Sequence, residues 1–155
     1  MRLKSVLQEA SYSAWRMPDS KNLKQEYNVE YKHHVRDQIG DIWPTYNDFV
    51  DDVKKAKKTK VSKSMDRSIS NRSRTQSKEQ LIRLVKGYAS WPEFRNEKSI
   101  DKLYSRIENN ESLDMPLVLK TNNGLQVMAG NTRMDVAFQQ GVSPTVLVID
   151  VSDKT

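Results

Sequence analysis

The last forty residues constrain the fold most, because their apolar side chains follow the spacing of strands before a helical pattern returns. Leu117 and Leu119 share one strand face with Val118 on the other, and Leu125, Val127 and Ala129 continue the alternation. The Asn-Asn-Gly sequence at 122–124 between them favours a tight turn, so the pattern predicts a β-hairpin. We expect a helix that stops at Gly141 and then a strand over 145–151.

The junction between the second hairpin strand and this helix predicts an anion site. Gly130 and Asn131 follow the strand, Thr132 is suited to cap the helix, and Asp135 stands where a capping-box carboxylate would stand. Backbone N–H groups at a helix start are unpaired and carry partial positive charge. With Arg133 beside them, they are expected to bind phosphate.

Helices are predicted upstream of the hairpin. Leu3, Val6 and Leu7 favour a short helix over residues 1–10, and Thr45 with Asp48 forms a capping-box signature for another. Apolar residues at helical spacing predict two more helices, over residues 78–89 and 100–107.

Composition limits the chemistry of the chain. It contains no cysteine, which excludes a disulfide scaffold, a cysteine-ligated zinc ion, an iron–sulfur cluster and thiol catalysis by this chain. No apolar run is long enough to span a bilayer, so we expect a cytoplasmic protein with no membrane partner. The fold expected is α+β. A small mixed sheet with flanking helices occupies residues 77–155, a basic linker or lid occupies 59–76, and a largely helical, basic N-terminal extension occupies 1–58.

Positive charge gathers in the middle of the chain. The net charge is +6, and twelve basic residues lie between positions 54 and 86 against only Asp66 and Glu79. A polyanion such as DNA or RNA is therefore an expected partner. Arg72 and Arg74 belong either to a lid over a bound phosphate or to a flexible linker. The nucleic-acid or lid residues are Lys54, Lys55, Lys57, Lys58, Lys60, Arg72 and Arg74.

Two further patterns each allow two interpretations. The adjacent His33 and His34 could suggest a metal site. Neighbouring side chains point in different directions, however, and no third ligand follows at a suitable spacing. We therefore expect a surface or structural pair and predict no metal site. Aromatic residues in a basic region suit either a groove for single-stranded nucleic acid or a small core. These aromatic residues are Trp15, Tyr27, Tyr31, Trp43, Tyr46 and Phe49.

From about residue 100 to residue 151 the chain resembles the ParB/sulfiredoxin superfamily, specifically a ParB-like N-terminal domain. The resemblance rests on the order of a helix, Met-Pro-Leu-Val at 115–118, the hairpin, Met-Ala-Gly-Asn-Thr-Arg at 128–133, a helix and a terminal strand. It implies that a Gly-x-x-Arg turn binds the phosphates of a nucleoside triphosphate, ATP or CTP, with Mg²⁺. The turn residues are Gly130, Asn131, Thr132 and Arg133.

The same resemblance implies a nucleotide-dependent phosphotransferase or nucleotide hydrolase acting in nucleic-acid metabolism. The absence of cysteine excludes sulfinic-acid reduction, and we expect no DNA-segregation role because the chain carries no further DNA-binding region. Glu79 and Asp135 are the candidate catalytic carboxylates, although Glu79 also suits a surface position and Asp135 a capping role. Whether the protein is an enzyme is left open, and the alternative is a non-enzymatic DNA- or RNA-binding protein that uses the basic region 54–86.

Overall fold

The structure is a computed structural model that describes residues 12–87 and 97–155, so the helix expected over residues 1–10 lies outside the described residues. Within them the chain forms a five-stranded mixed sheet in the order β2-β7-β5-β6-β3 and a two-stranded sheet, β1-β4. The strands are β1 (Trp15–Arg16), β2 (Lys57–Lys60), β3 (Ile69–Ser70), β4 (Leu113–Asp114), β5 (Leu117–Thr121), β6 (Gly124–Ala129) and β7 (Thr145–Asp150).

The α+β class predicted from the sequence is therefore confirmed. Helices lie between the strands and after the last of them, and one, η1, is a π-helix. The helices are α2 (Ser20–Gln25), η1 (Glu26–Val35), α3 (Arg36–Ile39), α4 (Tyr46–Lys54), α5 (Lys63–Arg67), α6 (Lys78–Lys86), α7 (Glu97–Glu108), α8 (Asn131–Gln139) and the 3₁₀ turn η2 (Ser152–Lys154).

The predicted hairpin forms the centre of the large sheet. Strands β5 and β6 pair antiparallel, and Gly124 takes a φ of +112° in the turn between them. After α8 the chain returns as β7, which lies parallel to β5. Strand β6 therefore ends next to the start of α8, which places the predicted anion-binding junction beside the middle of the sheet.

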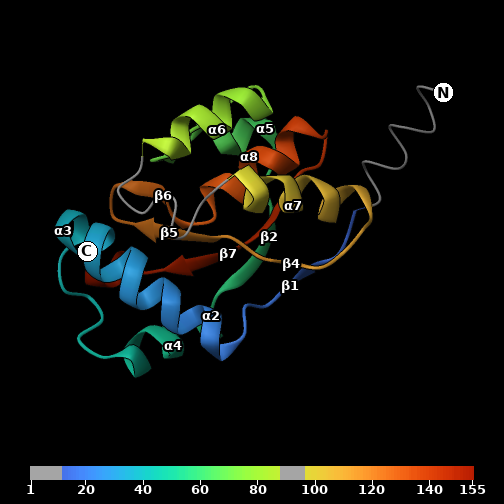
Figure 1. Ribbon diagram of the computed structural model, residues 1–155. Coiled ribbons are helices and arrows are strands. Elements are labelled where there is room, and N and C mark those ends of the chain that lie inside the picture. Colours follow the sequence, from blue (N-terminus) through green and yellow to red (C-terminus); the bar gives the residue numbers. More distant parts are fainter. Residues whose placement is uncertain (1–11, 88–96) are drawn as a thin grey trace.

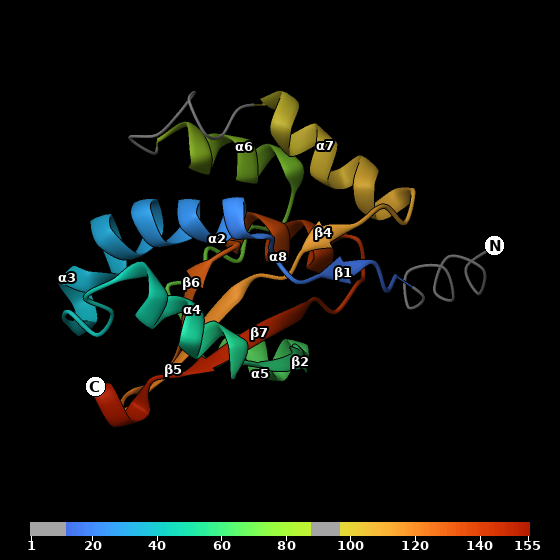
Figure 2. The same cartoon turned by 90° about the horizontal axis from the view of Figure 1, so that it is seen from below.

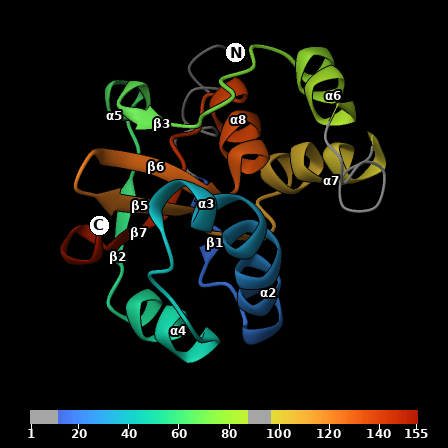
Figure 3. The ribbon, with the colours of Figure 1, turned by 90° about the vertical axis from the view of Figure 1, so that its left-hand side faces the viewer.

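Helices cover both faces of the sheet. On one face Leu119 and Ile149 pack against α2, η1 and α4, while on the other Val118 and Val146 pack against Met134 of α8. Helices α6 and α7 then pack on the outside of α8. Figures 1 and 3 show these layers, with α2 and α4 on one side of the sheet and α8, α6 and α7 on the other.

Four of the six aromatic residues form a core rather than a groove, and the other two, Trp15 and Tyr46, are partly buried against it. Tyr27, Tyr31, Trp43 and Phe49 are all buried. The rings of Tyr27 and Tyr31 stack at 5.3 Å between centroids, and those of Trp43 and Phe49 meet edge to face at 4.9 Å. A single-stranded nucleic-acid groove built from these four rings is therefore excluded, because none of them can reach a base.

The π-helix η1 explains why residues 23–35 show no clear period in the sequence. The buried residues Leu23, Tyr27, Tyr31 and Val35 recur at every fourth position. That interval falls between the 3.6 residues per turn of an α-helix and the roughly 4.4 expected for i→i+5 hydrogen bonds. The wider winding of η1 keeps these side chains on one side of the element, over the sheet.

The domain boundaries expected from the sequence are wrong. The sequence predicts an extension over residues 1–58, yet η1 and α4 share a hydrophobic core with β5 and β7. It predicts a linker or lid over residues 59–76, yet this segment contains the second half of β2 together with α5 and β3. Strands β2 and β3 are the two edges of the large sheet, so the described residues fold around one sheet.

Asp52 of α4 joins the buried indole of Trp43 to the C-terminal turn. Asp52 accepts hydrogen bonds from Trp43 Nε1 at 2.8 Å and from Lys154 Nζ at 2.7 Å. Burial raises the pKa of the Asp52 carboxyl, but these two bonds outweigh burial and hold that pKa below its ordinary value of 3.8. Because the folded pKa is depressed, Asp52 stabilises the fold above the unfolded pKa and loses this effect as pH falls through the folded value.

We expect Asp52→Asn to lower the free energy of unfolding at neutral pH by about 1–2 kcal/mol, since it removes the charged acceptor of both bonds. We also expect this variant to lose less stability than the parent when the pH falls below about 4. Urea unfolding followed by tryptophan fluorescence measures both effects. Asp51→Asn is the control, because Asp51 is exposed and forms no ion pair among the described residues. Equal behaviour of the two variants would contradict the prediction.

Candidate functional site

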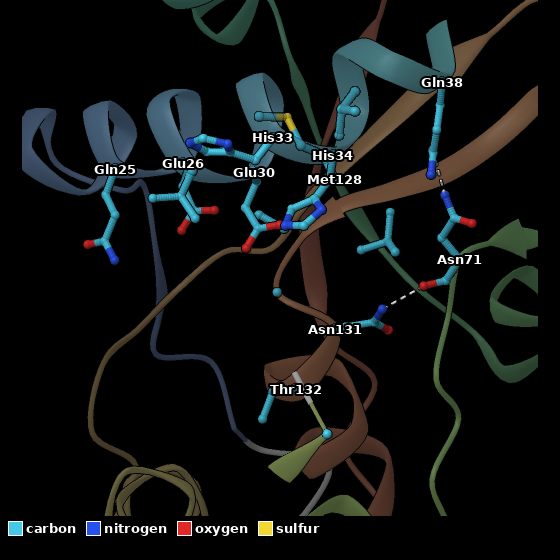
Figure 4. A pocket seen from close by; sticks show the side chains of 16 residues that line it. Gln25, Glu26, Glu30, His33, His34, Gln38, Asn71, Met128, Asn131 and Thr132 are labelled. Carbon is cyan, nitrogen blue, oxygen red and sulfur yellow. Dashed lines mark hydrogen bonds between the residues drawn. The ribbon is translucent and has the colours of Figure 1, made fainter. Parts of the chain in front are cut away.

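A cavity of about 790 Å³ lies between η1 and the start of α8. One wall is the polar face of η1, which presents Glu30, His33 and His34. The opposite wall is the end of β6 and the start of α8, which includes Asn131 and Thr132. Figure 4 shows the side chains of the two walls facing one another across the space, with Asn71 beside Asn131. The cavity joins residues about a hundred positions apart in the sequence.

Helix α8 begins at this cavity without a side-chain cap. Its N-cap is Gly130, which has no side chain, and Thr132 is already the second helical residue. The expectation that Thr132 caps the helix with Asp135 as its capping-box partner is therefore wrong. First-turn N–H groups have no acceptor within their own helix, so they are suited to bind an anion at the cavity wall.

Gly130 is required at this junction for two reasons. Its φ of +99° is strained for residues with a side chain, and its backbone lies directly against Pro116. A Cβ placed on Gly130 would lie 2.6 Å from Pro116 Cβ and 2.9 Å from Pro116 Cα. The tight approach of β6 to β5 therefore sets the direction in which α8 leaves the sheet.

Asn131 is held by the loop that follows β3. Its Oδ1 accepts hydrogen bonds from Ser73 N at 3.0 Å and from Arg72 Nη1, and its Nδ2 donates to the carbonyl of Asn71. Gln38 of α3 accepts a hydrogen bond from Asn71 Nδ2 at 3.1 Å (Figure 4). These bonds fix the first turn of α8 to the loop, and through Asn71 to α3.

Behind Asn131 lies a buried ion network centred on Arg72. The Arg72 side chain is only 1% exposed, and its Nε donates to Asp66 Oδ1 at 2.6 Å. Its Nη1 lies 2.7 Å from Asp135 Oδ1 and forms an ion pair with it, but the two groups are not aligned for a hydrogen bond. Asp135 Oδ2 accepts from Ser73 Oγ at 2.6 Å and from Thr75 N at 3.0 Å. Arg72 therefore belongs to the interior and cannot be part of a mobile lid.

Asp135 is likewise placed away from the cavity. Its charge raises the pKa of the nearby Tyr104 phenol, although burial of Tyr104 is the larger cause, and together they bring that pKa to about 12. The Tyr104 hydroxyl therefore stays protonated, and it donates a hydrogen bond to Gln139 Oε1. The other candidate carboxylate, Glu79, is exposed in the first turn of α6 and does not line the cavity. Neither predicted catalytic residue lines the cavity.

Arg133 and Arg74 also differ from their predicted roles. Arg133 Nη1 donates to the carbonyl of Asp114 at 2.9 Å, and the residue is not among those that line the cavity. Arg74 Nη2 donates to the carbonyls of Asp66 and Ile69, both at 2.6 Å. Both guanidinium groups thus brace the backbone. The five lysines of the predicted site, Lys54, Lys55, Lys57, Lys58 and Lys60, are exposed on α4, the turn after it and β2, away from the cavity.

Sequence reasoning missed the polar wall of the cavity. Its residues recur as pairs at positions 25–26, 29–30 and 33–34 and end with Gln38. On an α-helix, with about 100° per residue, Gln25 and Gln38 would lie on different sides. The wider π winding of η1 brings them to one side. The four-residue interval was the signal that could have identified this wall.

Among the described residues no group of three histidine or acidic side chains is arranged to hold a metal ion. In the same residues no helix is both long and apolar enough to cross a membrane. Comparison with known proteins finds no family model, curated protein or solved structure that matches this chain.

Proposed function

We propose that this chain binds a nucleoside triphosphate in the cavity between η1 and α8 and acts on its phosphates, as a nucleotide-dependent phosphotransferase or nucleotide hydrolase in the cytoplasm. One observation carries the proposal. The uncapped first turn of α8 meets a cavity whose opposite wall presents carboxylate and imidazole groups. Anion-binding amides and proton-transfer groups thus share one space, which is the combination that phosphoryl chemistry requires. The sequence resemblance to ParB/sulfiredoxin domains supports the same assignment.

The size and lining of the cavity suit a nucleotide. Its volume of about 790 Å³ falls within the range of about 300–1,000 Å³ found for small-molecule sites. Val29, Val127 and Met128 provide apolar surface for a base or ribose. The N–H groups of Asn131 and Thr132 would hold the phosphates, and Arg133 acts as a brace rather than as a phosphate ligand.

Magnesium fits this site only together with the nucleotide. Mg²⁺ is commonly bound by one or two carboxylates plus phosphate oxygens and water, and Glu26 and Glu30 both line the cavity. These two residues would hold the ion, which would neutralise charge on the phosphates. The protein by itself supplies too few ligands for a complete site among the described residues.

His33 and Glu30 replace Glu79 and Asp135 as the residues proposed to move a proton. Both lie on the exposed or half-exposed face of η1 and line the cavity. A histidine or glutamate at this place can accept the proton of an attacking hydroxyl or water. The rigid packing of the buried side of η1 against the sheet would hold these groups in position.

If the nucleotide occupies this cavity, filling the cavity should weaken nucleotide binding. Val29→Trp adds a bulky ring on the cavity wall, and we expect it to weaken binding of ATP and CTP by at least about tenfold, or about 1.4 kcal/mol. Isothermal titration calorimetry with Mg²⁺ present measures this change. The matched control is Asn28→Trp, because Asn28 is the exposed neighbour of Val29 and does not line the cavity.

Two outcomes would contradict the proposal. Failure of the parent protein to bind either nucleotide would remove its basis, and equal loss in both tryptophan variants would show that the effect is not specific to the cavity. Release or transfer of phosphate is then followed in Glu30→Gln and His33→Ala. Unchanged turnover in both variants would assign the chemistry to other residues and leave the cavity as a binding site only.

A further inference from the structure

The basic residues between positions 54 and 78 form two groups in the structure. Arg72, Arg74 and Lys78 all form ion pairs with carboxylates. The seven basic residues between positions 54 and 67 are all exposed, and none of them forms an ion pair within the described residues. We call these residues the lysine strip: Lys54, Lys55, Lys57, Lys58, Lys60, Lys63 and Arg67.

The lysine strip runs along one edge of the molecule. Strand β2 is the outermost strand of the large sheet, and the chain enters it from α4 and leaves it into α5 (Figures 2 and 3). Lys58 and Lys60 lie on one face of β2 and Lys57 on the other, as their pairing with β7 requires. Side chains two residues apart on a strand are separated by about 6.6 Å, so the charges form a row rather than a single cluster.

Protection of the sheet edge does not account for the whole strip. Lysines on an edge strand deter pairing with another chain, which explains Lys57, Lys58 and Lys60. Lys54, Lys63 and Arg67 lie on the flanking helices, where there is no open edge to protect. Their charges extend the row beyond β2 in both directions.

Few carboxylates offset this charge. Burial raises the pKa of Asp52, but hydrogen bonds from Lys154 and Trp43 hold it below the ordinary value, as hydrogen bonds from Ser152 do for the pKa of Asp150; Lys55 and Lys57 add only a smaller, longer-range effect. Asp52 is already paired with Lys154, and Asp150 accepts hydrogen bonds from Ser152. The strip therefore keeps a net positive potential, which attracts a polyanion.

We propose that the lysine strip binds the phosphate backbone of double-stranded nucleic acid. Single strands are bound by combining positive charge with exposed aromatic rings, and residues 54–67, which hold the strip, contain no aromatic residue. A membrane surface would be joined through exposed apolar side chains, and the large exposed hydrophobics of the described residues are Met17 and Leu84, neither of which is on the strip. Backbone contact with a duplex needs only the row of cations.

This inference is independent of the proposed nucleotide site, because no residue of the strip lines the cavity. The test measures binding of the full chain to a fluorescent duplex DNA of arbitrary sequence by anisotropy, over about 50–200 mM salt. The strip variant is Lys55→Gln/Lys58→Gln/Lys60→Gln. The control variant, Lys21→Gln/Lys98→Gln/Lys102→Gln, removes the same charge from exposed lysines elsewhere.

Each lost phosphate contact reduces the slope of log affinity against log salt by about 0.9, so we expect the strip variant to reduce it by about 2.7 and the control by less than about 0.9. Circular dichroism of both variants verifies that they are folded. Three results would overturn the inference: no binding of the parent at low salt, equal slope changes in the two variants, or tighter binding to single-stranded DNA or to phosphatidylserine vesicles than to the duplex.

Discussion

Replacing Arg72 by methionine is expected to lower the free energy of unfolding by about 3–5 kcal/mol, because it leaves buried carboxylates without their cation. The Arg72 guanidinium lies between Asp66 and Asp135, whose side chains are 11% and 0% exposed. Methionine fills a similar volume but neutralises neither charge. Chemical denaturation of the parent and the variant measures the difference.

A control separates this effect from the loss of any surface arginine. Arg67→Met removes an exposed cation that forms no ion pair among the described residues, and we expect a change within about 0.5 kcal/mol. Arg72→Lys is expected to restore only part of the stability, since an ammonium group cannot reach Asp66, Asp135 and Asn131 as a planar guanidinium does. A fully stable Arg72→Met variant would show that the network contributes little to the fold.

Gly130→Ala is the second large effect, with an expected loss of about 2–5 kcal/mol. Overpacking against a rigid neighbour costs about 1–3 kcal/mol, and a strained backbone conformation costs a similar amount. Here the added Cβ would approach Pro116 Cβ to 2.6 Å, and Gly130 has a φ of +99°. Neither Pro116 nor the backbone of β5 can move aside without disturbing the sheet.

Gly124→Ala is the matched control for this variant. Gly124 has a φ of +112°, but an added Cβ would meet nothing within 4 Å. We expect it to cost about 1 kcal/mol, from backbone strain alone. Thermal or urea unfolding of the two variants then isolates the contact with Pro116. Similar losses in both would show that the close approach of β5 to the junction is not decisive.

The two large effects concern the same structural feature from opposite sides. Gly130 fixes where α8 leaves the sheet, and the Arg72 network holds Asn131, the first residue of that helix. We therefore expect a folded fraction of either variant to bind nucleotide more weakly than the parent, even though neither side chain is proposed to touch the nucleotide. Intact binding in both would mean that the first turn of α8 does not need this support.

The local elements were largely predictable from the sequence. The capping box of Thr45 and Asp48 is present at α4, and α6 begins at Lys78 as the helical spacing predicts, with Ser77 as its N-cap. The hairpin of β5 and β6 follows the apolar alternation and turns at Gly124. Each of these features depends on residues within a few positions of one another, which is why a sequence pattern can specify them.

Other elements had no such local signal. Strand β2 has the sequence Lys-Lys-Thr-Lys and lies at an edge of the sheet, where it buries few side chains. It therefore shows no alternation of apolar and polar residues that would predict a strand. The buried residues of η1 recur at every fourth position, an interval that matches neither the 3.6-residue period of an α-helix nor the two-residue period of a strand. Both segments are placed by the sheet and core that they join, which no window of sequence contains.

The sequence by itself determined the α+β class, the hairpin, the helix that follows it, and the excess of positive charge in the middle of the chain. The tertiary structure alone decided which of those charges are exposed and which are paired inside, and which polar side chains meet the start of α8. The physical reason is distance along the chain. Burial, ion pairing and the cavity depend on contacts between residues many positions apart, whereas periodicity and capping act within a few residues.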